Sequence, residues 1–136
     1  DAVFARLTDN ISPYGETLEV KGRIIEVETV ANGVARFTFA QLCEQPHGAE
    51  DYLTIARAYR TVFLESVPKL DKSKRNEAKR LMTLIDALYD TGPQLVLSAD
   101  APAEDLYQGK DHGFEFQRTV SRLIEMQSPQ YLEKQQ

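Results

Sequence analysis

Two arginines near the carboxyl end of the sequence, Arg118 and Arg122, are the residues best suited to do chemistry. They are four positions apart, so a helix places both guanidinium groups on one face, with Glu125 one turn further on. The planar set of donors on arginine suits phosphate or carboxylate groups. An apolar stripe at helical spacing would anchor this helix from behind, and it consists of Val120, Leu123 and Ile124. The alternative is a surface helix whose arginines pair with Glu125 and nearby acids, a common and weak arrangement.

The elements that must hold this helix in place are predicted by the periodicity of residues 61–99. Residues 61–67 form a β-branched and aromatic run that ends at Pro68, which is typical of an interior strand. A helix then starts near Ser73 or Asn76 and stops at Gly92-Pro93. Residues 95–99 form a second buried strand. This order predicts a βαβ unit with parallel strands and a right-handed crossover.

An antiparallel hairpin is predicted over residues 18–39. The dipeptide Asn32-Gly33 lies between alternating runs, and this is the strongest short-range signal for a hairpin. Before it, the alternation changes phase between residues 18–24 and residues 25–29, which indicates a strongly twisted or bulged strand. Residues 1–16 are predicted to form a short helical remnant and a loop. The fold class is therefore α/β, with a mixed sheet, the parallel βαβ unit, the hairpin and flanking helices.

Polar residues follow the two predicted parallel strands where each strand ends. Ser98 and Asp100 lie at the end of the second strand, and Glu65-Ser66 lies near the end of the first. Ligands of open α/β sheets collect at the carboxyl ends of the strands, so these residues are candidates for binding. Asp86 falls within an otherwise apolar helix. It is interpreted either as a partner of an arginine or as a capping or surface residue.

Composition restricts the classes of function that remain. A chain of 136 residues is one domain's worth, and its formal net charge of -5 argues against nonspecific binding of nucleic acid. The basic residues between positions 69 and 80 are interrupted by Asp71 and Glu77, which is typical of the solvated start of a helix. A single cysteine and the absence of an apolar run of about 20 residues favour a cytoplasmic protein without a membrane span. Cys43 and His47 are four apart, too few ligands for a zinc site.

Six runs in the sequence, in this order, resemble the carboxy-terminal part of the ZapE family of cell-division-associated P-loop ATPases, which is related to the mitochondrial LACE-type proteins. The runs are residues 39–43, 51–53, 62–68, 84–89, 98–102 and 118–128. The resemblance extends from about Leu18 to Leu132. It departs from the family at Leu81, where an aromatic residue is expected.

The phosphate-binding loop that such an ATPase requires is not found in the sequence. The only Gly-Lys pair is Gly109-Lys110, with Glu104 where a glycine is needed and Asp111 where a hydroxyl is needed. Residues 62–65 end in Glu65 like a Walker B strand, but no aspartate for magnesium stands beside it. The resemblance therefore implies a carboxy-terminal fragment, with residues 1–16 as a remnant and residues 17–136 as part of an AAA-like ATPase domain. ATP and Mg are expected on the full-length protein and not on this fragment alone.

The resemblance also implies roles for the candidate residues. Arg118 or Arg122 is expected to act on nucleotide, with the effect of Arg122 the larger or equal, either as a phosphate sensor in the same protomer or as a finger that reaches a neighbour. Ser98 and Asp100 are expected to contribute to the site. Expected partners are proteins of the cell-division machinery, with possible self-association through the ATPase domain. The competing hypothesis is a non-catalytic interaction module. Arginines that converge with the strand ends would favour the ATPase; arginines paired with acids elsewhere would favour the module.

Overall fold

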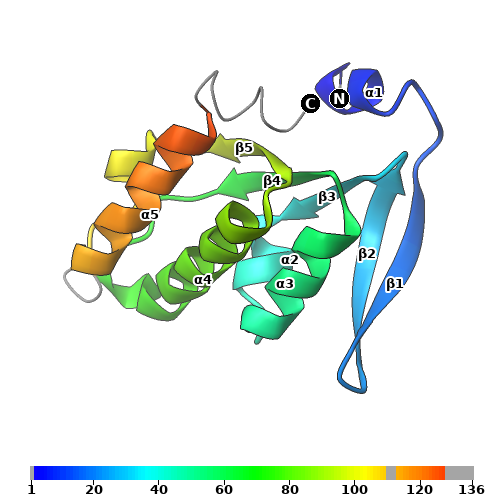
Figure 1. The fold of residues 1–136 in the computed structure, drawn as a ribbon. Helices are drawn as coiled ribbons and strands as arrows, with labels where there is room; N and C mark the ends of the chain where they lie inside the picture. Colours follow the sequence, from blue (N-terminus) through cyan, green and yellow to red (C-terminus); the bar gives the residue numbers. More distant parts are fainter. Residues whose placement is uncertain (1, 110–112, 128–136) are drawn as a thin grey trace.

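A five-stranded mixed sheet forms the centre of the molecule. The structure, a computed structural model, describes residues 2–109 and 113–127 (Figure 1). The strand order is β1-β2-β3-β4-β5; the pairs β1–β2 and β2–β3 are antiparallel, and the pairs β3–β4 and β4–β5 are parallel. The strands are β1 (Tyr14–Val20), β2 (Arg23–Ala31), β3 (Val34–Thr38), β4 (Thr61–Val67) and β5 (Gln94–Ala99). This topology confirms the α/β class, the parallel pair in residues 61–99 and the mixed sheet.

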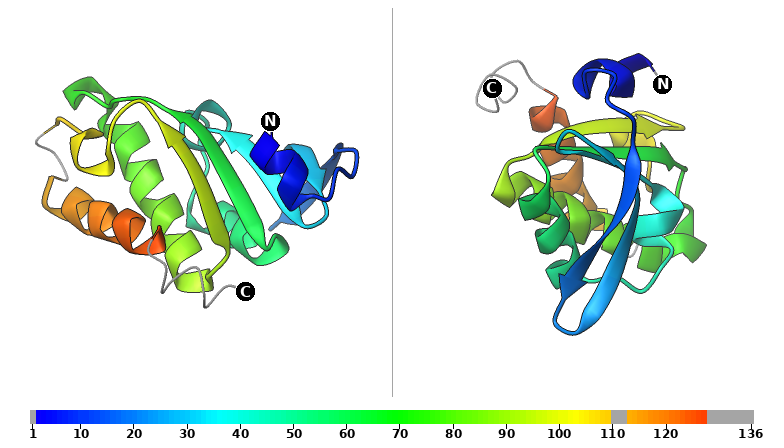
Figure 2. Two further views of the ribbon diagram at one scale, coloured as in Figure 1. Left: turned by 90° about the horizontal axis from the view of Figure 1, so that it is seen from above. Right: turned by 90° about the vertical axis from the view of Figure 1, so that its right-hand side faces the viewer.

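Helices cover the two faces of the sheet unequally (Figures 1 and 2). The main core lies between one face and four helices, α2 to α5, whereas α1 packs alone on the other face. The helices are α1 (Ala2–Leu7), α2 (Phe39–Cys43), α3 (Ala49–Ala58), α4 (Arg75–Thr91) and α5 (Gly113–Met126), with 3₁₀ turns η1 (Lys72–Lys74) and η2 (Ala103–Asp105). Within the described part of the chain, none of the helices is long and apolar enough to span a membrane.

The central strand β4 explains this two-sided packing. Successive side chains of a strand point to opposite faces, so Val62 and Leu64 enter the main core while Phe63 faces α1. Phe63 meets Phe4 of α1 edge to face, with 5.4 Å between the ring centroids. All three strand residues are at most 2% exposed. A β-branched and aromatic run without alternation is therefore what a strand buried on both faces requires.

The crossover helix α4 has the predicted boundaries. Asp71 caps η1 by accepting a hydrogen bond from the backbone N–H of Ser73 at 2.8 Å, and α4 continues from there. It ends at Gly92, whose φ of 100° is available to glycine at little cost, and the Gly92 N–H donates to the Leu88 carbonyl. The apolar stripe of α4 is buried, and it consists of Ala78, Leu81, Met82, Ile85 and Leu88. Of the stripe predicted for the last helix, Leu123 is buried and Val120 half-buried, but Ile124 is 58% exposed, so its prediction as an anchor is wrong.

The hairpin at Asn32-Gly33 is confirmed, but the prediction of one twisted strand before it is wrong. β1 and β2 are two strands joined by a tight turn at Lys21-Gly22, where φ is 47° and 81°. The change of phase falls at Ile24-Ile25, inside β2 and after the turn, and an irregularity of the kind predicted does occur further along β2, between Val27 and Val30. β1 also begins at Tyr14, inside the segment predicted as a loop. A lysine in the left-handed conformation is uncommon, so the sequence contained only a weak signal for a turn at Lys21-Gly22.

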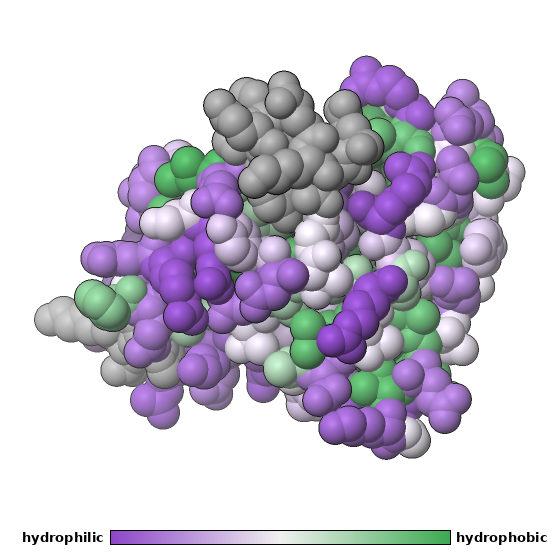
Figure 3. Space-filling view, viewed as in Figure 1, coloured by the Kyte–Doolittle hydropathy of each residue, from purple (hydrophilic) through white to green (hydrophobic). Residues whose placement is uncertain are grey.

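On the face of the molecule shown in Figure 3, hydrophilic and hydrophobic residues are mixed.

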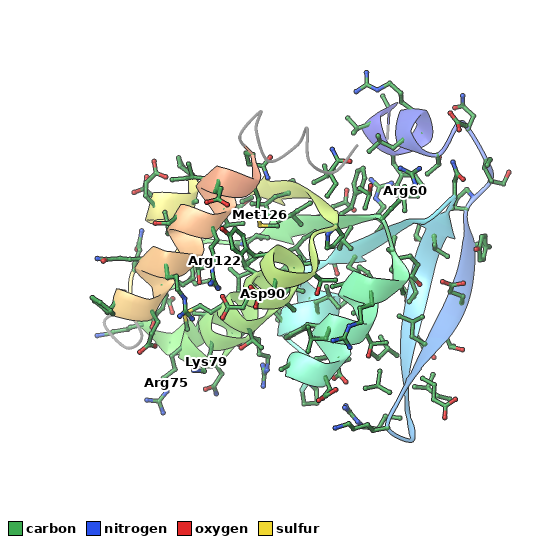
Figure 4. All side chains as sticks on the ribbon, in the orientation of Figure 1. Arg60, Arg75, Lys79, Asp90, Arg122 and Met126 are labelled. Carbon is green, nitrogen blue, oxygen red and sulfur yellow. The ribbon has the colours of Figure 1, made fainter. Side chains whose placement is uncertain are left out.

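Replacing Ile85 by alanine should lower the free energy of unfolding by about 2–5 kcal/mol, because the side chain is fully buried between α4 and the sheet. Chemical denaturation of the purified chain measures this change. Lys79→Ala, at an exposed position of the same helix (Figure 4), is the control and should change stability by no more than about 0.5 kcal/mol. Equal stabilities for the two variants would contradict the placement of the stripe.

Candidate functional site

The two arginines singled out in the sequence converge on one carboxylate. Arg118 Nη2 lies 3.2 Å from Asp86 Oδ2, and Arg122 donates to the other oxygen of the same side chain. Arg122 belongs to α5, and its side chain lies at the contact with α4, the helix that carries Asp86 (Figure 4). Of the two interpretations of Asp86, the structure shows the partner of an arginine. A single aspartate thus orients two guanidinium groups that are one helical turn apart.

The two arginines differ in how much they are enclosed. The guanidinium of Arg122 lies 4.8 Å from the centre of the Tyr89 ring, a favourable cation–π geometry, and its side chain is 23% exposed. Tyr89 in turn donates its hydroxyl to Glu125 at 2.6 Å. The Arg118 side chain is 60% exposed. Arg122 is therefore fixed between the helices, while Arg118 has room to leave Asp86 and contact another molecule.

Ser98 and Asp100 lie at the carboxyl ends of β4 and β5. The backbone N–H of Ser66 donates to Ser98 Oγ at 3.0 Å, and the N–H of Asp100 donates to the Val67 carbonyl at 2.9 Å. Ser66 has a φ of 62°, unusual for a residue other than glycine, at an irregularity in the pairing of β4 with β5. Both candidate side chains are exposed there. A non-glycine residue in this conformation is held by its surroundings, and such positions are concentrated at functional sites.

The structure therefore separates the candidate residues into two groups. In the described ranges, neither Arg118 nor Arg122 forms a hydrogen bond or ion pair with Ser98 or Asp100. The arginines instead meet Asp86 at the contact between α4 and α5. The part that the four residues play in binding nucleotide stays a prediction.

Glu65, the acid of the Walker B-like run, belongs to an ion pair that the sequence did not reveal. Arg36 binds it with two parallel hydrogen bonds, Nε to Oε1 at 2.7 Å and Nη2 to Oε2 at 2.8 Å. The guanidinium also lies 5.1 Å from the ring centre of Phe4 and 5.9 Å from that of Phe63. The hydrogen bonds from Arg36 lower the pKa of Glu65, although partial burial opposes the shift. Glu65 is thus an ionised carboxylate already committed to a partner.

A buried carboxylate, Asp51, binds His47, one of the two residues considered as zinc ligands. Asp51 is fully buried and accepts hydrogen bonds from Arg23, from His47 Nδ1 at 3.0 Å and from the Gly48 N–H. Burial raises the pKa of the Cys43 thiol to about 12, so this thiol is a poor nucleophile. Among the described residues, no group of three or more His, Cys, Asp or Glu side chains is arranged to hold a metal ion.

Comparison with known proteins places this geometry in context. The family model described as AFG1-like ATPase matches residues 1–135. The chain is 38% identical over 135 residues to the cell division protein ZapE of Escherichia coli K12, covering 99% of this chain and 36% of that protein. It is also 38% identical over 146 residues to lactation elevated protein 1 homolog B of Danio rerio, covering 84% of this chain and 29% of that protein.

The chain thus spans about a third of the length of the curated relatives that it matches. No solved structure matches it.

Glu65→Gln should lower the free energy of unfolding by about 1–3 kcal/mol at pH 7, because it removes the charge from the acceptor of two hydrogen bonds from the partly buried guanidinium of Arg36. The folded pKa of Glu65 lies below its unfolded value. The contribution is therefore fully present above the ordinary glutamate pKa of about 4.3 and is lost as pH falls through the lower folded value. Urea denaturation from pH 7 to pH 3 measures the difference between the two proteins.

The exposed Glu104→Gln serves as the control for this experiment and should show no such pH dependence. A stability difference for Glu65→Gln that stays constant to pH 3 would contradict the assigned pKa shift.

Proposed function

The chain belongs to the AFG1-like ATPase family, and we propose that it forms part of an ATP-hydrolysing protein associated with cell division. The observation that carries this proposal is the family match, which includes nearly every residue of the chain. The link to cell division comes from the similarity to ZapE of E. coli, whose name states that role. Partners in the division machinery are proposed on the same basis.

We infer that Arg118 is the residue that contacts the phosphates of ATP. Its side chain is 60% exposed and is attached to Asp86 by one hydrogen bond of 3.2 Å, so it can exchange that carboxylate for a phosphate oxygen. Arg122 would position Asp86 and hold α5 against α4. The sequence favoured Arg122 for the contact with nucleotide; the exposures reverse this order.

The side chains in the two groups of candidate residues are better suited to bind ATP than to bind a magnesium ion. Two guanidinium groups on one helix face suit an anionic phosphate chain, and the hydroxyl of Ser98 lies at a strand end where ligands of α/β sheets collect. ATP, when bound, would supply the phosphoanhydride bond that is hydrolysed, and Mg would neutralise the charge of its phosphates. The described residues hold no group suited to a metal ion. Asp100 at the strand end would contribute a polar contact, while the P-loop and the magnesium ligands would come from another part of the protein.

A non-catalytic interaction module is the second candidate function. The observation that favours it is the pairing of both arginines with Asp86, away from Ser98 and Asp100. In that case the arginines stabilise the contact between α4 and α5 and have no part in nucleotide binding.

Arg118→Ala, introduced into a polypeptide that joins this chain to its P-loop, should lower ATP turnover at least about 10³-fold, the range for an arginine that stabilises the transition state. Its effect on stability should stay below about 1 kcal/mol, because the ion pair is exposed. Steady-state turnover and thermal melts measure the two effects. Arg57→Ala, at an exposed arginine of α3, is the matched control. Mixing the Arg118 variant with a subunit that lacks a working P-loop would tell action within a protomer from action across an interface.

The Arg122→Ala variant should lower both stability and turnover, since it removes a half-enclosed side chain. If both arginine variants keep full turnover and only melt at lower temperature, the interaction module replaces the ATPase role for this chain.

Residues 1–136 alone should not bind ATP with micromolar affinity, because a P-loop is needed to surround the phosphates with backbone amides. Isothermal titration calorimetry with Mg-ATP tests this expectation. Heat of binding that saturates at micromolar ATP and disappears in Arg118→Ala would show that the chain holds a complete phosphate site of its own.

A further inference from the structure

The β1–β2 hairpin leaves part of the sheet open. β2 pairs with β1 from Arg23 to Val30, but it pairs with β3 only at residues 29–31. The hairpin therefore extends beyond β3, as Figures 1 and 2 show. Beside the free part of β2, where β3 gives way to α2, lies a groove with a volume of about 430 Å³. This groove is distinct from the arginine cluster and from the strand ends.

The groove presents an unpaired strand edge. The two-residue turn places Val20 opposite Arg23, and in an antiparallel ladder alternate residues direct their backbone groups away from the partner strand. Ile24 and Glu26 therefore point their N–H and C=O groups away from β1 and toward the groove. Within residues 2–109 and 113–127, these backbone groups have no hydrogen-bond partner on that side. They are available to an incoming strand.

Two features that normally prevent edge pairing, lysine and proline, are missing from residues 24–27. Natural sheets protect open edges with lysine, proline, bulges or a covering element. Residues 24–27 contain neither lysine nor proline, and their pairing with β1 is regular. Ile24 is 68% exposed, which is a large exposed fraction for an isoleucine that lines a groove. The irregularity in the pairing of β1 with β2 lies beyond this part, where Tyr14 to Glu16 of β1 spans Val27 to Val30 of β2.

Charge at the groove selects the occupant. Glu26 and Glu28 are two residues apart on β2, so they share a face about 7 Å apart, which matches two side chains at alternate positions of an added strand. The nearby cations are already paired, Lys21 with Glu50 and Arg23 with Asp51. The polar lining residues of the groove are Glu26, Glu28, Gln41, Gln45 and His47.

We propose that this groove binds an extended polypeptide segment with basic residues at alternate positions, which adds as a strand to the free edge of β2. Backbone hydrogen bonds to Ile24 and Glu26 provide the pairing, and the two glutamates select lysine or arginine. Ile24 provides apolar contact for a residue of the incoming segment that points to the same face.

Fluorescence anisotropy with a labelled peptide, acetyl-Val-Lys-Val-Lys-Val-amide, tests the proposal. The peptide should bind the chain, and Glu26→Lys should raise Kd at least about tenfold, whereas Glu104→Lys, a charge-matched change at an exposed site, should leave Kd within about twofold. A peptide N-methylated on all five residues keeps the charge but loses its donors on both edges, and it should not bind. Exchange of the Ile24 and Glu26 amide hydrogens should slow when the first peptide is added.

Three results would overturn the proposal. Equal binding of the normal and N-methylated peptides would show attraction by charge alone, and unchanged amide exchange at Ile24 and Glu26 would place the peptide elsewhere. A concentration-dependent dimer that Glu26→Lys dissociates, without peptide binding, would assign the groove to a second copy of the chain. Glu26→Gln, a milder change, replaces Glu26→Lys if circular dichroism shows that the latter does not fold; an unaltered Kd in the folded variant would also overturn the proposal.

Discussion

The burial of β4 on both faces is the constraint on which the rest of the structure depends. A central parallel strand cannot leave either face in water, since its side chains alternate between two apolar environments. Val62 and Leu64 require the helices α2 to α5 on one side, and Phe63 requires a cover on the other. That cover is a single short helix, α1, and the guanidinium of Arg36, which lies against both Phe4 and Phe63. Arg36 thus has two roles: it pairs with Glu65, and its guanidinium covers the rings of Phe4 and Phe63.

The contact between α4 and α5 shows how a polar side chain can organise an apolar interface. Asp86 lies among buried residues of α4 and is neutralised by two arginines from α5. Removing the aspartate would leave both guanidinium groups without a counter-charge, and removing one arginine would leave the other in place. The arrangement therefore tolerates the departure of the exposed Arg118 better than that of Arg122. Such an asymmetry suits a pair in which one member holds the geometry and the other is free to exchange partners.

Local patterns in the sequence predicted most of the fold, and contacts between distant residues account for what was missed. Asn32-Gly33, the run ended by Pro68 and the stripe ended by Gly92 each encode their element over a few residues, and the structure confirms all three. The turn at Lys21-Gly22 was missed because lysine rarely adopts a positive φ. The pairing of Arg36 with Glu65 depends on the register between β3 and β4, which the sequence of neither strand contains. The meeting of Asp86 with the arginines likewise depends on how α5 packs on α4.

The attachment of α1 has a consequence for the energy landscape of the native state. Phe4 is the single buried residue of this six-residue helix, and the segment is otherwise held by hydrogen bonds such as that from Arg60 to the Leu7 carbonyl. Opening of α1 alone therefore exposes little surface and costs less than global unfolding, so α1 forms a separate cooperative unit. Each opening admits water to Phe63 and to the Arg36–Glu65 pair while the main core stays closed. The amino-terminal helix can therefore open and expose the Arg36–Glu65 pair to water without any opening of the sheet.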